Sequence, residues 1–168
     1  MRTLHLLRHA KSSWDDDTLA DHERPLSSRG IRDAKRIAEH LRTLDARLDL
    51  VLCSSAVRTQ QTLGLVKPSL GDAAVHVEDG LYAASADALL ERLRGIPESA
   101  HSALVVGHNP GLQDLVLHLA APGPLLEKVI AKFPTGALAT LALADRTWIS
   151  VHQGDAVLVG YAVPRDLS

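Results

Sequence analysis

Hydrophobic residues in this chain form short runs that alternate with longer amphipathic segments. Apolar runs at 4–7, 50–53 and 103–106 have the length and composition of strands buried on both faces of a sheet. Between them, apolar residues recur every three or four positions, as they do along one face of a helix. Strands that alternate with helices predict an α/β fold, a three-layer sandwich with a mostly parallel central sheet and helices on both faces.

The helices can be placed from their end signals. Ser27 is a good N-cap, and the apolar positions of the helix that follows are Ile31, Ala34, Ile37, Ala38 and Leu41. Further helices are expected at 56–66 and 86–93, and from Pro110 to about 120 with Asn109 as N-cap. A short strand is expected at 75–77.

The last third of the chain is less regular. A turn at 122–124 precedes a short helix or ordered loop that reaches 132. Strands are expected at 137–144 and 147–151, joined by a turn at Asp145-Arg146. Residues 155–163 form either one more strand or a loosely ordered tail.

A long polar loop covers residues 10–26, and loops of this length are often functional. It contains three consecutive aspartates, Asp15, Asp16 and Asp17. They could be metal ligands, but hard-cation loops usually space their ligands at alternate positions, so a solvated acidic turn is favoured.

Composition narrows the class of protein. The 168 residues predict one domain, 1–168, and a net charge of -2 gives no general reason to bind nucleic acid or an anionic membrane. The single Cys53 has no disulfide partner within the chain, which favours a reducing compartment. No signal-peptide pattern and no apolar run of about 20 residues is present. We therefore expect a cytoplasmic enzyme or binding domain.

The candidate chemistry lies where the predicted strands end. The carboxyl ends of parallel strands meet at one edge of a sheet, and that edge would collect Arg8, His9, Arg58 and His108. Arg24 could reach the same place from the long loop. Three arginines and two histidines make an anion pocket, for which phosphate is the leading candidate.

Elimination leaves a histidine as the nucleophile. The chain has no Gly-rich Walker loop, and no two histidines have metal-ligand spacing such as His-x3-His. Cys53 and Arg58 are one residue closer than in the Cys-x5-Arg loop of phosphotyrosine-type phosphatases. A neutral imidazole can attack phosphorus and form a phosphohistidine intermediate. Nearby arginines would keep it neutral and would balance charge on the phosphoryl oxygens.

Four blocks of sequence resemble the histidine phosphatase superfamily, also called the phosphoglycerate mutase-like family. They are an Arg-His-Ala form of the Arg-His-Gly signature at 7–12, and the segments 24–30, 54–62 and 106–110. The short length and the Gly-His-Asn-Pro block look closest to the SixA-type phosphohistidine phosphatase branch.

The resemblance implies a phosphoglycerate mutase-like fold and a role for each matched position. It makes His9 the phosphoryl acceptor, with Arg8 and Arg58 on the phosphoryl oxygens and His108 as a further donor to them. It also makes Arg24 a phosphate-facing arginine. It implies no metal and no organic cofactor.

One departure bears on the substrate. Many relatives that cleave phosphate esters carry a glutamate after the third strand as proton donor, and the matching residue here is Ala83, with Glu78 and Asp79 nearby but offset. An alkoxide needs that proton far more than an imidazole does. The leading prediction is a phosphatase acting on phosphohistidine, with a histidine phosphotransfer-type protein as partner. The alternatives are a phosphomonoesterase acting on a small phosphorylated metabolite and a phosphate-binding module without turnover.

Overall fold

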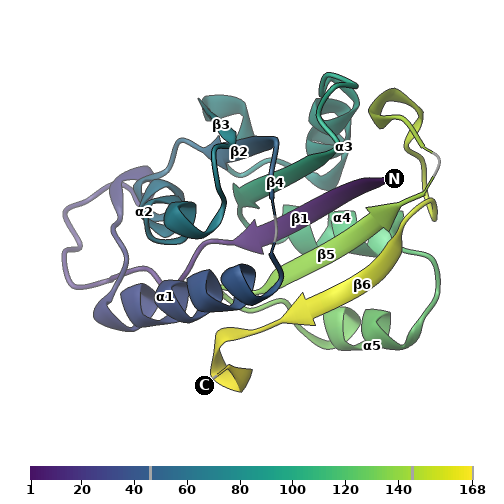
Figure 1. The fold of residues 1–168 in the computed structure, drawn as a ribbon. Helices are drawn as coiled ribbons and strands as arrows, with labels where there is room; N and C mark the ends of the chain where they lie inside the picture. Colours follow the sequence, from purple (N-terminus) through teal and green to yellow (C-terminus); the bar gives the residue numbers. More distant parts are fainter. Residues whose placement is uncertain (46, 145, 168) are drawn as a thin grey trace.

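The computed structural model describes residues 1–45, 47–144 and 146–167, arranged around a six-stranded sheet (Figure 1). The strands are β1 (Arg2–Arg8), β2 (Leu50–Ser54), β3 (Ala74–Glu78), β4 (Ser102–Gly107), β5 (Leu138–Leu143) and β6 (Val157–Ala162). Their order in the sheet is β3-β2-β4-β1-β5-β6, and β5 runs in the direction opposite to the other five strands. The predicted mostly parallel sheet is confirmed.

Helices cover both faces of this sheet, as predicted. They are α1 (Ser28–Thr43), α2 (Val57–Val66), α3 (Ala86–Arg94), α4 (Gly111–Leu119) and α5 (Pro124–Ala131). Figure 1 shows α1 and α2 in front of the sheet and α3, α4 and α5 behind it. Alternate residues of β1 enter the two cores: Leu7 packs with α1 and α2, whereas Leu4 and Leu6 pack with α3, α4 and α5. Strands buried on both faces read as continuous apolar runs, which is why the sequence revealed them.

The start of α1 is fixed by capping and by a close backbone approach. The Ser27 Oγ accepts a hydrogen bond from the Gly30 N–H at 3.0 Å, which confirms the predicted N-cap. A Cβ on Gly30 would lie 2.1 Å from the Lys11 carbonyl oxygen, so only glycine fits here. The helix is thereby held against the loop that follows β1. Of its predicted apolar face, only Ile31 is exposed, at 40%.

The region after β5 differs from the prediction. The strand expected at 147–151 is wrong, because Trp148–Ser150 form a short 3₁₀ helix. Trp148 is fully buried and its indole N–H donates to the Ala100 carbonyl at 2.7 Å, so its apolar character reflects core packing and not strand pairing. On the side away from β1, the strand that pairs with β5 is β6, so the strand option for 155–163 is confirmed. The turn predicted at Asp145-Arg146 starts outside the described residues.

Two helices in the second half of the chain lie close to their predicted positions. The short helix option before 132 is confirmed as α5. The helix α4 begins at Gly111, one residue later than predicted, with Pro110 in the capping position. The Asn109 side chain still helps to close the first turn, since its Oδ1 accepts from the Gln113 N–H at 3.3 Å.

Candidate active site

The sheet register brings the two predicted histidines together. Arg8 of β1 lies opposite Gly107 of β4, and the His9 N–H donates to the Gly107 carbonyl at 3.0 Å. His9 and His108 therefore leave adjacent strands side by side, with ring centroids 5.3 Å apart. Arg58 joins them from the first turn of α2, the helix that follows β2, and β2 is the neighbour of β4 in the sheet. Arg8, His9, Arg58 and His108 all line one cavity of about 470 Å³.

The imidazole of His9 is held in one orientation and kept neutral. Its Nδ1 lies 2.7 Å from the Ala10 carbonyl oxygen, an acceptor only, so Nδ1 carries the hydrogen and Nε2 keeps a free lone pair. The pKa of His9 is lowered to about 3, chiefly by burial and to a smaller extent by Arg58, His108 and Arg8, although the bond to Ala10 opposes this. His9 is thus a neutral imidazole at physiological pH.

The two cavity arginines have donors to offer an anion. The Arg8 guanidinium donates to the Phe133 carbonyl at 3.0 Å, but its buried Nε–H has no partner among the described residues. Arg58 donates to Asp21 twice, to the carbonyl oxygen at 2.7 Å and to Oδ2 at 3.1 Å. A buried donor without a partner is costly, and a phosphoryl oxygen is the kind of acceptor that would satisfy it.

His108 is held by a serine that the sequence analysis did not assign. Its Nε2 lies 2.8 Å from the Ser54 Oγ, and its Nδ1 lies 3.4 Å from an Arg58 nitrogen. Arginine can only donate, so the contact with Arg58 makes Nδ1 of His108 the acceptor, and the ring hydrogen lies on Nε2. The Ser54 Oγ then accepts from the His108 Nε2–H and also from the Ala56 N–H, the latter at 3.3 Å. Burial lowers the pKa of His108 to about 4.

An unexpected carboxylate lies in the cavity. Asp21, from the long loop, accepts hydrogen bonds from the Tyr82 hydroxyl at 2.5 Å and from Arg58. The Tyr82 bond and the Arg58 charge lower the pKa of Asp21, although slight burial opposes them, so the group is ionised at neutral pH. No sequence pattern separates Asp21 from the other acidic residues of that loop, and only the fold brings it to Arg58.

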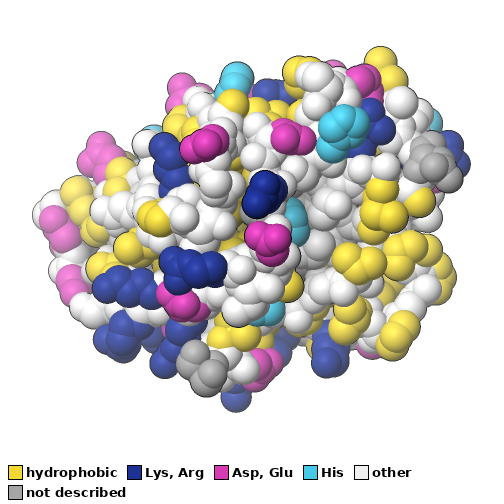
Figure 2. All heavy atoms as spheres, in the orientation of Figure 1, with side chains coloured by type: hydrophobic (Ala, Val, Ile, Leu, Met, Phe, Trp, Pro, Cys, Tyr) yellow, Lys and Arg dark blue, Asp and Glu magenta, His cyan; other side chains and the backbone are white. Residues whose placement is uncertain are grey.

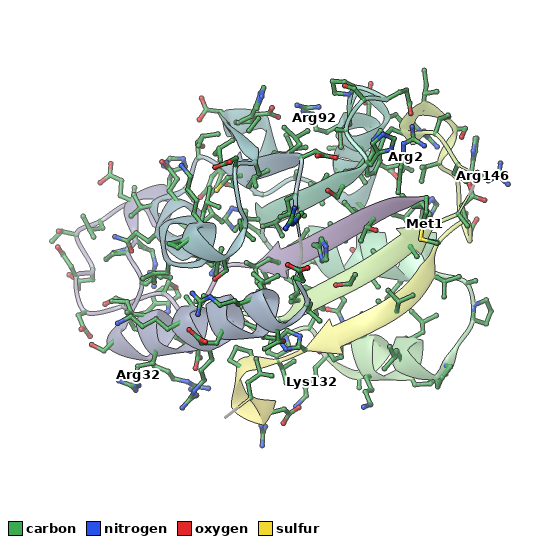
Figure 3. All side chains as sticks on the ribbon, in the orientation of Figure 1. Met1, Arg2, Arg32, Arg92, Lys132 and Arg146 are labelled. Atoms are coloured by element: carbon green, nitrogen blue, oxygen red, sulfur yellow. The ribbon has the colours of Figure 1, made fainter. Side chains whose placement is uncertain are left out.

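The position at which the family resemblance predicts a proton-donating glutamate is Ala83, which brings no acidic side chain into the cavity. Ala83 lines the cavity, with a left-handed backbone at φ 55°. The nearby Glu78 is turned away, since both its oxygens accept from Arg92 at 2.7 and 2.8 Å (Arg92 is labelled in Figure 3). Asp79 begins a short 3₁₀ helix and is not among the residues that line the cavity.

Two other candidates lie apart from this group. The guanidinium of Arg24 stacks on the Trp14 ring and donates to the Ser13 carbonyl at 3.0 Å. Arg24 is not among the residues that line the cavity, and its phosphate-binding role stays a prediction. Cys53 is buried, and burial raises the pKa of its thiol to about 12, so it carries no thiolate at neutral pH. Within the described ranges, no three His, Cys, Asp or Glu side chains gather as a metal site.

Comparison with solved structures identifies the fold. A protein from Nakamurella multipartitia that bears the name phosphohistidine phosphatase SixA matches 97% of this chain and 96% of its own at 30% identity, with a TM-score of 0.86. A protein of the same name from Agrobacterium tumefaciens matches 97% of this chain and 99% of its own at 26% identity, with a TM-score of 0.81. The fold is phosphoglycerate mutase-like, of the SixA type.

Sequence comparison then identifies the family. Residues 4–103 match the histidine phosphatase superfamily (branch 1). An uncharacterised protein of Mycobacterium tuberculosis, Rv1276c, is 38% identical over 163 residues, which cover 95% of this chain and all of that protein. The chain belongs to the histidine phosphatase superfamily, as its four sequence blocks predicted. None of the helices among the described residues is both long and apolar enough to cross a membrane.

Proposed function

We propose that this chain is a phosphatase that removes phosphate from phosphohistidine on a protein. The observation that carries the proposal is the state of His9, a neutral imidazole with a free Nε2 lone pair beside two arginines. Family membership supports phosphatase chemistry, and the names of the similar SixA structures support the phosphohistidine substrate.

The proposed reaction has two steps. The His9 Nε2 lone pair attacks phosphorus, the substrate P–N bond breaks, and the substrate imidazole leaves with the electron pair and takes up a proton from solvent. A water molecule then attacks the phosphoryl group on His9, that P–N bond breaks, and inorganic phosphate departs. Arg8 and Arg58 would donate to the outer oxygens, where charge accumulates. Once Arg58 turns from His108 to the phosphoryl group, Nδ1 of His108 could carry the ring hydrogen and donate as well.

The choice of substrate rests on the missing proton donor. An alkoxide leaving group needs a general acid, whereas an imidazole does not. Ala83 supplies no proton, and Glu78 is engaged with Arg92. The proposed mechanism uses no metal, so EDTA is expected to leave turnover unchanged.

The test compares substrates and variants under one set of conditions. A histidine-phosphorylated phosphotransfer protein and a panel of alkyl phosphate esters are incubated with the wild type and with His9→Ala, with and without EDTA. We expect rapid loss of phosphohistidine, slow ester turnover and no activity in the variant. Dominant ester turnover would favour a small-molecule phosphomonoesterase, and phosphate binding without any turnover would favour a binding module.

A further inference from the structure

The exposed side of α1 concentrates positive charge on a chain whose net charge is -2. Its exposed basic residues are Arg29, Arg32, Lys35, Arg36 and Arg42, against one exposed acid, Glu39. Figure 2 shows lysine and arginine side chains gathered at the lower left, over α1, and Figure 3 shows Arg32 directed away from the ribbon. A patch of one sign on a near-neutral molecule is the usual mark of an oppositely charged partner.

Part of this surface is a groove. It has a volume of about 210 Å³, and its lining includes Arg29, Arg32 and Arg36 of α1 together with Arg165 near the C-terminus. The buried Asp33 lies at its side and pairs with two of them, at 3.7 Å to Arg29 and 3.3 Å to Arg36. One carboxylate against four guanidinium groups leaves the groove strongly positive. We call it the α1 groove.

The α1 groove continues into the candidate active site. Thr135 lines both the groove and the cavity that holds His9. The next residue, Gly136, donates its N–H to the carbonyls of Arg8 and His9 at 3.1 and 3.0 Å. The groove and the cavity therefore adjoin at Thr135, and a partner bound along the groove lies next to the phosphoryl pocket.

We propose that the α1 groove docks an acidic surface of the protein that carries the phosphohistidine, so that its phosphorylated imidazole enters the cavity at His9. This inference rests on the proposed function and names the partner's chemistry. Complementary charge of this kind speeds encounter and fixes orientation more than it adds affinity.

A nucleic acid fits this surface less well. Trp14 lines the same cavity, and the exposed Asp15, Asp16 and Asp17 follow it directly. These acids would repel a polyanion laid across the site, whereas a folded protein can present acidic groups to α1 and other groups to the loop.

The test reverses charges that hold nothing else in place. Arg32 and Arg165 form no ion pair within the described part of the chain, unlike Arg29 and Arg36, which hold Asp33. The double variant Arg32→Glu/Arg165→Glu is therefore chosen, and Lys67→Glu/Lys128→Glu makes the same charge change on exposed residues outside the groove. Each is assayed on a phosphohistidine protein and on free phosphohistidine, at low salt and at about 0.3 M salt.

We expect the groove variant to lose about tenfold or more in kcat/KM on the protein at low salt, with the difference shrinking at high salt. Free phosphohistidine turnover and the lysine variant should match the wild type. Equal losses on both substrates, or no loss on the protein, would overturn the docking proposal. So would an unchanged rate on the protein combined with lost binding to double-stranded DNA. A wild type inactive on both phosphohistidine substrates would instead refute the proposed function itself, and the docking proposal with it.

Discussion

The hydrogen bond between Ser54 and His108 offers a sharp test of how the candidate site is held. Both side chains are buried, and the Oγ–Nε2 distance is 2.8 Å. Ser54→Ala removes the hydroxyl, which leaves Nε2 of His108 and the Ala56 N–H without their partner. A buried polar group left unsatisfied costs about 1–3 kcal/mol, so we expect a loss of this size in the free energy of unfolding. For a chain of this length that lowers Tm by about 2–4 °C per kcal/mol.

The same substitution should affect catalysis separately. Without the Ser54 hydroxyl, the His108 ring loses the partner of its Nε2 and can turn away from the phosphoryl group. Loss of one donor to the phosphoryl oxygens is expected to lower kcat/KM at least tenfold, equivalent to about 1.4 kcal/mol in the barrier. The assay is steady-state hydrolysis of phosphohistidine, with thermal unfolding measured on the same samples.

A matched control separates the two effects. Thr59 is another fully buried hydroxyl in the same turn, and its Oγ1 donates to the carbonyls of Ser54 and Ala56 at 2.7 and 2.8 Å, without touching His108. Thr59→Val should lower Tm by a similar amount and leave kcat/KM within about threefold of the wild type. If both variants lose activity in proportion to stability, the argument that Ser54 orients His108 is refuted.

Four further results are expected. Asp21→Asn should strengthen inhibition by inorganic phosphate by up to about fivefold, because it frees the buried Arg58 from a pair with the exposed Asp21 carboxylate that is worth about 0.2–1 kcal/mol; weaker inhibition would contradict this. Iodoacetamide at neutral pH should leave Cys53 unlabelled and activity intact, since the pKa of the thiol is raised to about 12, and inactivation with labelling would count against a buried thiol. The pKa values of His9 and His108 are lowered to about 3 and 4, so kcat/KM should show no decline with a midpoint near 6.5, the ordinary histidine value. Because the unfolded state then binds more protons, the free energy of unfolding should fall as the pH is lowered from about 6.5, and denaturant titrations at pH 7 and 5 would detect the opposite trend.

The residues that the sequence revealed share a simple placement. Arg8, His9 and His108 lie at the ends of apolar runs, and Arg58 lies in the first turn of the helix that follows such a run. Predicting the strands is therefore enough to place all four at one edge of the sheet. The order of the strands was not predicted; the structure supplies the pairing of β1 with β4, which puts His9 beside His108. The candidate site was therefore predictable to the extent that it is built on strands.

What the sequence did not reveal comes from loops and from packing. Asp21 reaches Arg58 across 37 positions, and Tyr82 reaches Asp21 across 61, contacts that no periodicity records. The strand expected at 147–151 failed for a related reason, since the apolar Trp148 and Val151 fill the core beneath α3 and not a ladder position. Hydrophobic pattern reports burial, and burial is shared by strands, short helices and turns that cover a core.

The ionised Asp21 also constrains which leaving group the site can accept. A carboxylate whose pKa is lowered by Tyr82 and Arg58 is deprotonated at neutral pH, so it has no proton to give to a departing alkoxide. It also competes with a phosphoryl group for Arg58, and it places negative charge beside an incoming anion. A chain selected to cleave alkyl esters would gain from a protonated acid at this place. An imidazole can leave without a proton from the enzyme. The ionised Asp21 and the alanine at position 83 therefore both support the proposed phosphohistidine substrate.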